Sequence, residues 1–407
     1  MNKKKSVFPN WIMFLLTAVH KMLERCWGGY IKRNIPIDKS IVLFNSKPDY
    51  SDNARALAEY MLSNGYTKNY KIFFDVENLP KYKGSVEGIT FVSCKNKWMW
   101  FNLKNMRLMI TAGFTMFTHG PLLSEKYKKT EQFNVCLWHG CGYKNRSRND
   151  KMDVRKFDMA LVPGELFVKP KSFFWNVDEK YISPIGYPRY NWLMSKSSNA
   201  EKLINLFKNT ELTKIVIWMP TFRNDIQGKL TDSEIITQFP LVADDKQWKN
   251  LDALCKESDV VLLVKLHRLQ PDYGVPYNSF TNIRKINEDF FESHGVQMYE
   301  FLAWTNALIS DYSSVAVDYL IVDRPIAFAL QDYEDYKCTR GFVFEEPRDY
   351  MPGHHLYSFE DLKRFISDVS ANLDPYREKR KQMFDIAITC SNDYCLDVLN
   401  KIGIYNK

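Results

Sequence analysis

Polar residues of types that perform acid–base chemistry or hold phosphate follow directly on four short apolar runs. These residues are His139, Thr221, Arg223, Lys265, His267, Asp311, Ser313 and Ser314. A neutral imidazole takes up a proton near neutral pH, and guanidinium, ammonium and hydroxyl groups bind phosphate oxygens. Because the carboxyl ends of parallel strands meet at one edge of a sheet, we expect these side chains to line one pocket.

The stretch VCLWHGCGYKNRSRND, residues 135–150, places His139 where an apolar run gives way to a loop. Gly140 and Gly142 allow the backbone of this loop to approach a ligand closely. The loop also carries three basic side chains, those of Lys144, Arg146 and Arg148. These residue types predict a general base at His139 beside an anionic substrate, which the three cations guide.

The stretch ISDYSSVAVDY predicts a strand that ends at Ile309 and a helix that starts near Ser313. Ser313 and Ser314 would then offer hydroxyls and free N–H groups at a helix start, which is a favourable place for phosphate. Plain N-capping by serine explains the same pattern equally well. Spacing alone leaves the two interpretations open.

Arg223 and His267 can each bring a cation or a hydrogen-bond donor to a diphosphate, but either also suits an ordinary surface or interdomain position. Glu300, on the expected helix before residue 306, can accept from ribose hydroxyls or be a solvated helix residue. Asp318 is interpreted as structural or ribose-binding.

Several nucleotide and metal signatures are missing from the sequence. There is no GxxxxGK[ST], which argues against a P-loop ATPase, and GCGYKN lacks the third glycine of the dinucleotide fingerprint. There is no DxD and no His/Cys cluster with metal-ligand spacing. We therefore expect no cofactor and no metal, and chemistry that rests on a base, basic side chains and helix dipoles.

The elements that must position these residues alternate between strand-like runs and helical stretches. The strand-like runs are 40–46, 70–76, 88–94, 107–113, 133–140, 157–164 and 180–189, then 214–223, 259–267, 280–286, 306–314 and 324–330. Residues 53–64 predict a helix that stops at Gly65, residues 195–200 a linker, and residues 358–402 a mostly helical end. This alternation predicts two doubly wound α/β domains that face a cleft.

The net charge of +8 at pH 7 is concentrated near the N-terminus of the 407-residue chain. Residues 1–33 hold seven basic residues and one acidic residue, a net +6 that leaves +2 for the rest. The nearly neutral remainder argues against nucleic-acid binding. Tryptophans and aliphatic residues recur at helical spacing in this segment, which suits a membrane surface. A helix packed on the body of the protein is the alternative, since the apolar run is too short to span a bilayer.

The eight cysteines form no CxxC pair and no zinc spacing. Most lie in apolar runs, which predicts reduced core residues in a cytosolic protein. With the basic segment, this predicts a peripheral protein at the cytoplasmic face of the membrane. The sequence also predicts four parts: 1–33 at the membrane, 34–198 for the acceptor, 199–375 for the donor, and C-terminal helices over 376–407 packing back on the N-terminal domain.

The order of several motifs resembles that of the CDP-glycerol glycerophosphotransferase family, which comprises teichoic-acid primases and polymerases and related capsule polymerases. The motifs are WHGCGYK, GYPRYN, MPTFRND, KLH, YEFLAWTNALISDYSSVAVDY, RPIAFAL and YKCTRGFVFE. The resemblance runs from about residue 133 to residue 366 and is most specific over residues 299–344. In place of the family's frequent WHGTPLK, this chain has Cys141 and Gly142.

The resemblance implies a GT-B architecture and transfer of a polyol phosphate from CDP-glycerol or CDP-ribitol to an acceptor hydroxyl, with release of CMP. It implies that His139 is the general base and that Arg223, His267, Ser313 and Ser314 belong to the donor site. Thr221, Lys265, Asp311 and Glu300 are predicted in the same region. The acceptor is expected to be phosphate-containing, lipid-linked or polymeric, and reached at the inner leaflet.

Two other interpretations stay open from the sequence. One is a GT-B glycosyltransferase that uses a nucleotide-sugar donor in the same cleft. The other is a catalytically silent scaffold of the cell envelope. The polyol, the acceptor, the number of units added and the oligomeric state are not predicted by the sequence.

Overall fold

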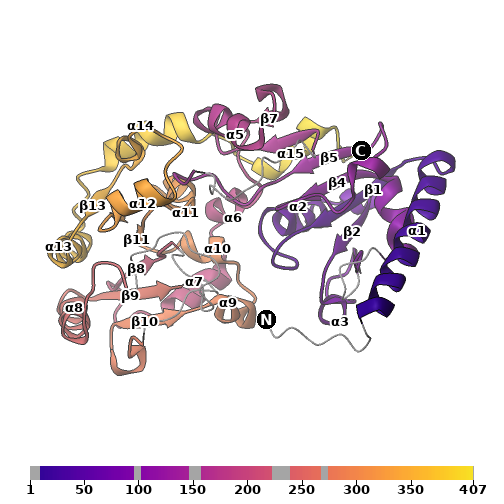
Figure 1. Ribbon diagram of the computed structural model, residues 1–407. Helices are drawn as coiled ribbons and strands as arrows, with labels where there is room; N and C mark the ends of the chain where they lie inside the picture. The colour runs from indigo at the N-terminus through magenta and orange to yellow at the C-terminus, as the bar shows by residue number, and fades with distance from the viewer. Residues whose placement is uncertain (1–9, 96–101, 146–156, 222–238, 267–273, 407) are drawn as a thin grey trace. The chain divides into compact units, whose positions relative to one another are not determined.

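The computed structural model describes residues 10–95, 102–145, 157–221, 239–266 and 274–406. Its strands form one sheet with the order β3-β2-β1-β4-β5-β6-β7 and a second with the order β10-β9-β8-β11-β12-β13 (Figure 1). The printed pairs among β1–β6 and among β8–β13 are parallel. Both orders reverse direction once, as in doubly wound α/β folds, which confirms the predicted fold class.

The strands of the first sheet are β1 (Asp38–Asn45), β2 (Lys71–Asp75), β3 (Ile89–Val92), β4 (Ala112–Phe117), β5 (Phe133–Cys136), β6 (Met159–Leu161) and β7 (Ile182–Ser183). Those of the second are β8 (Lys214–Trp218), β9 (Val260–Lys265), β10 (Ile283–Ile286), β11 (Ala307–Ser310), β12 (Ile326–Ala329) and β13 (His354–Leu356). Strand β9, with the sequence VVLLVK, is buried along its whole length. A continuous apolar run of this kind is typical of a strand covered on both faces of a parallel sheet.

The main helices are α1 (Asn10–Asn34), α2 (Asp52–Ser63), α4 (Met106–Thr111), α5 (Val168–Trp175), α6 (Tyr190–Met194), α7 (Ser198–Asn205), α8 (Asp245–Glu257), α9 (Glu288–His294), α10 (Met298–Leu302), α11 (Val315–Asp318), α12 (Tyr333–Thr339), α13 (Phe359–Ser370), α14 (Arg377–Ala387) and α15 (Tyr394–Ile402). The short α3 covers Leu79–Tyr82, and a single 3-10 turn, η7 (Tyr319–Val322), follows α11. The predicted helix over 53–64 is present as α2, and Gly65 follows it with a φ of 76°.

The chain forms two compact units. The first comprises residues Met1–His139, Arg155–Leu161 and Cys395–Lys407, and the second comprises Gly140–Val154 and Val162–Tyr394. The four functional parts predicted from the sequence stay a prediction. The compact units are divided elsewhere than after residue 198, since residues 140–154 and 162–198 group with the second unit.

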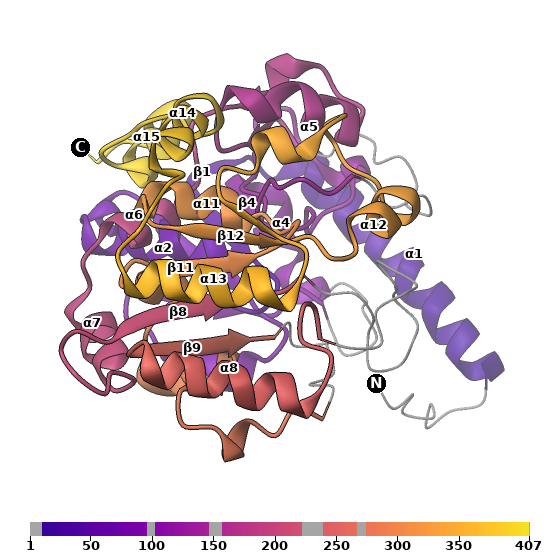
Figure 2. The same cartoon turned by 90° about the vertical axis from the view of Figure 1, so that its left-hand side faces the viewer.

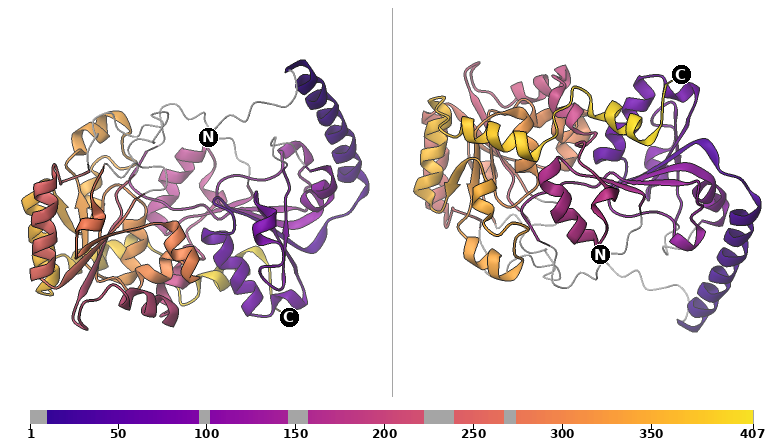
Figure 3. Two further views of the ribbon diagram at one scale, coloured as in Figure 1. Left: turned by 90° about the horizontal axis from the view of Figure 1, so that it is seen from below. Right: turned by 90° about the horizontal axis from the view of Figure 1, so that it is seen from above.

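The core of the first unit packs α1 and α4 against the sheet. Ile31 of α1 is fully buried together with Met106 and Ile110. Gly28 lies close to Tyr127 and Met106, so that a Cβ there would be 2.6 Å from the Tyr127 ring. Figure 3 shows the rest of α1 as a long rod along the edge of this unit. Glu24, Trp27 and Ile31 thus hold the C-terminal half of α1 on the body of the protein.

The core of the second unit lies between its sheet and the helices α8 and α13. Trp218 and Trp248 belong to it, with Val264, Ile309 and Phe365. Figure 2 shows α8 and α13 side by side over one face of the strands. This packing fixes the strands whose carboxyl ends carry the predicted phosphate-binding residues.

Three details of the predicted elements are wrong. The run 107–113 was predicted as a strand, but Met106, Met109 and Ile110 are buried at helical spacing in α4, and β4 follows at Ala112. The predicted linker 195–200 overlaps α7, because the Ser197 side chain caps that helix. Strand β13 escaped prediction because its three residues include two histidines and form no apolar run.

Candidate active site

His139 lies three residues beyond the end of β5, in the first unit, and its side chain is half-buried. Its Nδ1 atom is 3.2 Å from the carbonyl oxygen of Thr118. A carbonyl oxygen can only accept, so Nδ1 carries the proton in this contact. In the neutral ring the lone pair is then on Nε2, which is the state required of a general base.

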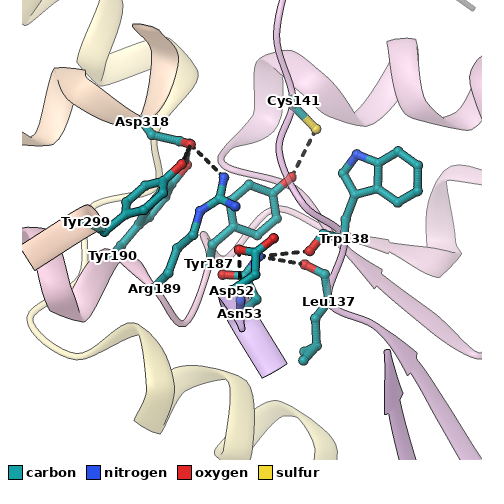
Figure 4. A network of polar contacts seen from close by, with 10 residues as sticks. All are labelled: Asp52, Asn53, Leu137, Trp138, Cys141, Tyr187, Arg189, Tyr190, Tyr299 and Asp318. Atoms are coloured by element: carbon teal, nitrogen blue, oxygen red, sulfur yellow. Dashed lines mark hydrogen bonds and ion pairs between the residues drawn. The ribbon is translucent and has the colours of Figure 1, made fainter. Parts of the chain in front are cut away.

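The backbone before His139 is held in a strained conformation. Trp138 has a φ of 53°, a value that bulky side chains rarely adopt. The amide nitrogen Nδ2 of Asn53 donates to the carbonyl of Trp138 at 2.9 Å and to that of Leu137 at 3.2 Å (Figure 4). Asn53 is fully buried at the start of α2. Asn53 therefore stabilises the turn that presents His139.

A second histidine, His119, was missed by the sequence reasoning. Its ring is stacked on that of His139 with centroids 4.2 Å apart and planes 10° apart. Its Nδ1 atom is 2.9 Å from the hydroxyl of Thr118. His119 follows β4, so the strand-end argument would have found it had the strand been placed at residues 112–117 rather than 107–113. The two histidines form one aromatic pair at the sheet's carboxyl edge.

Within the second unit, the loop that follows His139 in the chain packs on the Ser313–Ser314 turn. A Cβ on Gly142 would lie 2.7 Å from the backbone nitrogen of Ser314 and 2.9 Å from its Cα. Gly140 has a φ of 135° and also adjoins the Ser314 side chain. Gly140 and Gly142 were predicted to let a ligand come close to the backbone. In the structure they let the Ser313–Ser314 turn of the same chain come close.

The Ser313–Ser314 turn precedes α11, which starts at Val315, close to the predicted position. Both serines are half-buried. The Ser314 side chain makes no capping hydrogen bond. Simple N-capping by the side chain therefore does not explain the serine at position 314.

Thr221 and Asp311 lie at the switch point of the second sheet, after β8 and β11 respectively. The backbone N–H of Thr221 donates to Asp311 Oδ2 at 2.7 Å, and its hydroxyl donates to Oδ1. Asp311 is fully buried and Thr221 is 4% exposed. The two residues predicted at the donor site are thus brought together, and they fasten the ends of the two central strands to each other.

The remaining predicted residues differ in how the structure uses them. Lys265 is 7% exposed and its ammonium donates to Glu288 at 2.6 Å. Glu300 accepts the backbone N–H of Gln297 at 2.7 Å as part of a capping box at the start of α10. Lys144 forms a backbone bridge with Phe342. The other predicted residues, Arg146, Arg148, Arg223 and His267, lie outside the described part of the chain.

A buried network around Asp318 holds the other end of α11 (Figure 4). Its carboxylate accepts from Arg189 Nη2 at 2.6 Å, from the Tyr190 hydroxyl at 2.5 Å and from the Tyr299 hydroxyl at 2.6 Å. The Asp318 side chain is fully buried and that of Arg189 is 3% exposed. Burial, followed by the charge of Asp318, raises the pKa of Tyr190 well above its usual value. The tyrosine thus stays neutral and donates, which identifies Asp318 as structural.

Cys141, which departs from the family's usual threonine, is a packing residue. Its Sγ atom is 3.1 Å from the hydroxyl of Tyr187, and its side chain is fully buried. Burial raises the pKa of the Cys141 thiol. A neutral, enclosed thiol has little nucleophilic character. In the second unit, Cys141 therefore anchors the loop beside the serine turn.

The comparisons with known proteins identify the family of the chain. The model of the CDP-Glycerol:Poly(glycerophosphate) glycerophosphotransferase family matches residues 30–392. A teichoic acid poly(glycerol phosphate) polymerase of Bacillus spizizenii is 25% identical, over 81% of this chain and 83% of its own length. One of Staphylococcus epidermidis is also 25% identical over 87% of this chain, but the match spans only 49% of that longer protein.

The solved structure of a variant of the wall teichoic acid polymerase TagF, soaked with CDPG, has the same fold. It superposes with a TM-score of 0.69 at 22% identity and covers 97% of this chain and 98% of its own. The structural likeness confirms the GT-B-like fold, and the family match favours a glycerophosphotransferase over a nucleotide-sugar glycosyltransferase or a silent scaffold. The chain belongs to the CDP-glycerol:poly(glycerophosphate) glycerophosphotransferase family.

Proposed function

We propose that this protein transfers glycerol phosphate from CDP-glycerol to a hydroxyl of a lipid-linked or polymeric acceptor in cell-surface teichoic acid or capsule synthesis, and releases CMP. The observation that carries the proposal is which ring nitrogen of His139 holds the proton, in a chain of this family. Its Nδ1 atom faces the carbonyl of Thr118, which leaves Nε2 as the basic nitrogen.

In this reaction Nε2 of His139 takes the proton from the acceptor hydroxyl. The oxygen then attacks the phosphorus that bears the glycerol, and the bond from that phosphorus to the bridging oxygen breaks so that CMP leaves. General-base help of this kind is worth about 10²–10⁴-fold in rate.

The donor-site residues stabilise the negative charge that develops on the diphosphate. We assign this role to Arg223, His267, Ser313 and Ser314, with Lys265 and the Thr221–Asp311 pair shaping the same region. Cations and oriented hydroxyls that face developing negative charge stabilise phosphoryl-transfer transition states. The half-buried serines and the uncapped Ser314 hydroxyl support this assignment.

The remaining predicted residues take supporting roles in the proposal. Glu300 is assigned to the donor ribose through the carboxylate oxygen opposite its capping bond. Lys144, Arg146 and Arg148 guide the phosphate-containing acceptor. The N-terminal α/β part, residues 34–198, is the acceptor half, and residues 199–375 are the donor half.

The N-terminal helix α1 supports a location at the membrane surface. Large apolar side chains of α1 are exposed, among them Trp11 at 65%, Phe14 at 74% and Met22 at 58%. Basic residues accompany them, including Lys32 and Arg33 in the last turn. Among the described residues, no helix is long and apolar enough to cross a bilayer. We propose that α1 lies in the anionic inner leaflet, where a lipid-linked acceptor is within reach.

Liposome flotation tests the membrane part of the proposal. The double variant Trp11→Ser/Phe14→Ser should lose most of its binding to vesicles that contain anionic lipid. Leu212→Ser is the matched control, since Leu212 is 81% exposed and lies in the second unit. Equal flotation of the double variant and the wild type would contradict a membrane role for α1.

Donor profiling tests the reaction itself. Nucleotide release should be fastest with CDP-glycerol, which yields CMP, slower with CDP-ribitol and absent with UDP-sugars, when a soluble glycerol-phosphate acceptor is supplied. The length of the products separates addition of one unit from polymerisation. No CMP release from either CDP-polyol would refute the proposed function.

A further inference from the structure

A polar cavity of about 660 Å³ opens in the first unit at the carboxyl ends of β1, β2, β3 and β4. Asn45 and Asp75 are the last residues of β1 and β2, and His119 lies two residues beyond β4. The cavity thus sits at the switch point of the sheet, between β1 and β4, where open α/β sheets bind ligands. Its volume is in the range of small-molecule sites.

The floor of the cavity carries a carboxylate that can accept hydroxyl groups. Asp75 is 7% exposed, accepts the backbone N–H of Cys94 at 2.7 Å and accepts from Asn45 Nδ2 at 3.0 Å. A carboxylate has about four acceptor sites, so its bonds with Cys94 and Asn45 leave capacity for a ligand. Burial raises the pKa of Asp75, as expected for a carboxylate held away from solvent.

The rim of the cavity carries charges of both signs. Lys47 and Lys95 line it together with Glu77, whose carboxylate is 3.9 Å from the Lys47 ammonium. No Phe, Tyr or Trp is among the described residues that line it. A small polyol bearing one phosphate would find acceptors for its hydroxyls and ammonium groups for its charge in this cavity.

The cavity adjoins the proposed base, His139, through one of its lining residues. His119 lines the cavity, and its ring is stacked on that of His139 at 4.2 Å. Both rings and the whole cavity belong to the first unit. A ligand in this cavity therefore lies beside the side chain that packs on the proposed base.

We propose that this cavity binds the terminal polyol phosphate of the acceptor, with its hydroxyls on Asp75 and its phosphate on Lys47 and Lys95. This inference rests on the proposed function and adds the acceptor subsite to it. Residues that bind the acceptor end would then come from the strand ends of the first sheet, in addition to the basic loop after His139.

Saturation-transfer NMR, which measures the binding of glycerol 3-phosphate to the full chain, tests this subsite. Lys47→Ala should weaken binding about tenfold or more, as expected for loss of a charged hydrogen bond. Asp75→Asn should weaken it as well. Lys71→Ala is the matched control, because Lys71 lies at the other end of β2 and its side chain is 67% exposed. Circular dichroism verifies that each variant folds.

The possible outcomes separate this inference from the proposed function. If the chain releases CMP but Lys47→Ala and Lys71→Ala bind glycerol 3-phosphate equally well, the subsite is refuted and the reaction stands. If no CDP-polyol yields CMP while Lys47→Ala selectively loses the probe, the reaction is refuted and the subsite stands. Lys47 is an exposed residue, so its variant remains informative even if Asp75→Asn does not fold.

Discussion

Replacing Asp318 by Asn should destabilise the second unit strongly. The carboxylate is fully buried and pairs at 2.6 Å with Arg189, whose side chain is 3% exposed. Two tyrosine hydroxyls, those of Tyr190 and Tyr299, also donate to it. Removal of one partner of a buried ion pair leaves the other charge uncompensated and costs about 3–5 kcal/mol.

Urea unfolding followed by tryptophan fluorescence measures this loss, because Trp218 and Trp248 lie in the core of the second unit. The matched control is Asp178→Asn, which breaks an ion pair with Lys180 that is 66% exposed on both sides. Exposed pairs of this kind contribute at most about 1 kcal/mol. The two variants make the same chemical change, so burial is what differs between them.

The double variant Arg189→Met/Asp318→Leu separates loss of the ion pair from exposure of an unpaired charge. It removes both charges together, so it should be markedly less destabilised than the sum of the two single variants. Equal unfolding free energies for Asp318→Asn and Asp178→Asn would refute the conclusion that the buried network holds α11 in place.

Three further predictions concern the loop, the turn and pH. Asn53→Ala should lower the turnover number for CMP release about ten- to a hundredfold without changing the affinity for CDP-glycerol, since it frees the backbone before the base; unchanged turnover would remove Asn53 from the positioning of that base. Gly142→Ala should weaken CDP-glycerol binding in calorimetry about tenfold, because its Cβ would meet the backbone of Ser314, whereas Gly29→Ala, with only the end of a flexible side chain near, should not. Burial lowers the pKa of His354 below 6.5, so the unfolded chain takes up the proton first and stability falls as pH drops below about 6.5. The variant His354→Gln should therefore show a smaller change of the urea midpoint between about pH 7.5 and pH 5 than the wild type. An equal change of the midpoint with pH in both proteins would contradict this.

Local patterns were enough to predict the fold. Continuous apolar runs such as that of β9 are characteristic of buried parallel strands, and their alternation with helices predicted both sheets. The same patterns failed at β4, because Met109 and Ile110 form an apolar run in a helix that leads directly into the strand. That error concealed His119, which follows the true strand.

The candidate site was predictable in place but not in its contacts. The order of apolar runs and turns was enough to place His139, Thr221 and Asp311 at strand ends. The partner of the His139 ring is a carbonyl 21 residues away in sequence, and Arg189 lies 129 residues from Asp318. Pairings over such distances depend on the register of the sheets and the path of the loops, which no local pattern specifies.

The most direct measurement of the central claim is the turnover of His139→Ala with CDP-glycerol and a glycerol-phosphate acceptor, together with calorimetry of donor binding. We expect the variant to bind CDP-glycerol as the wild type does and to release CMP at least about 10²-fold more slowly. Turnover close to that of the wild type would contradict it, because the proton of the acceptor would then have to leave by another route.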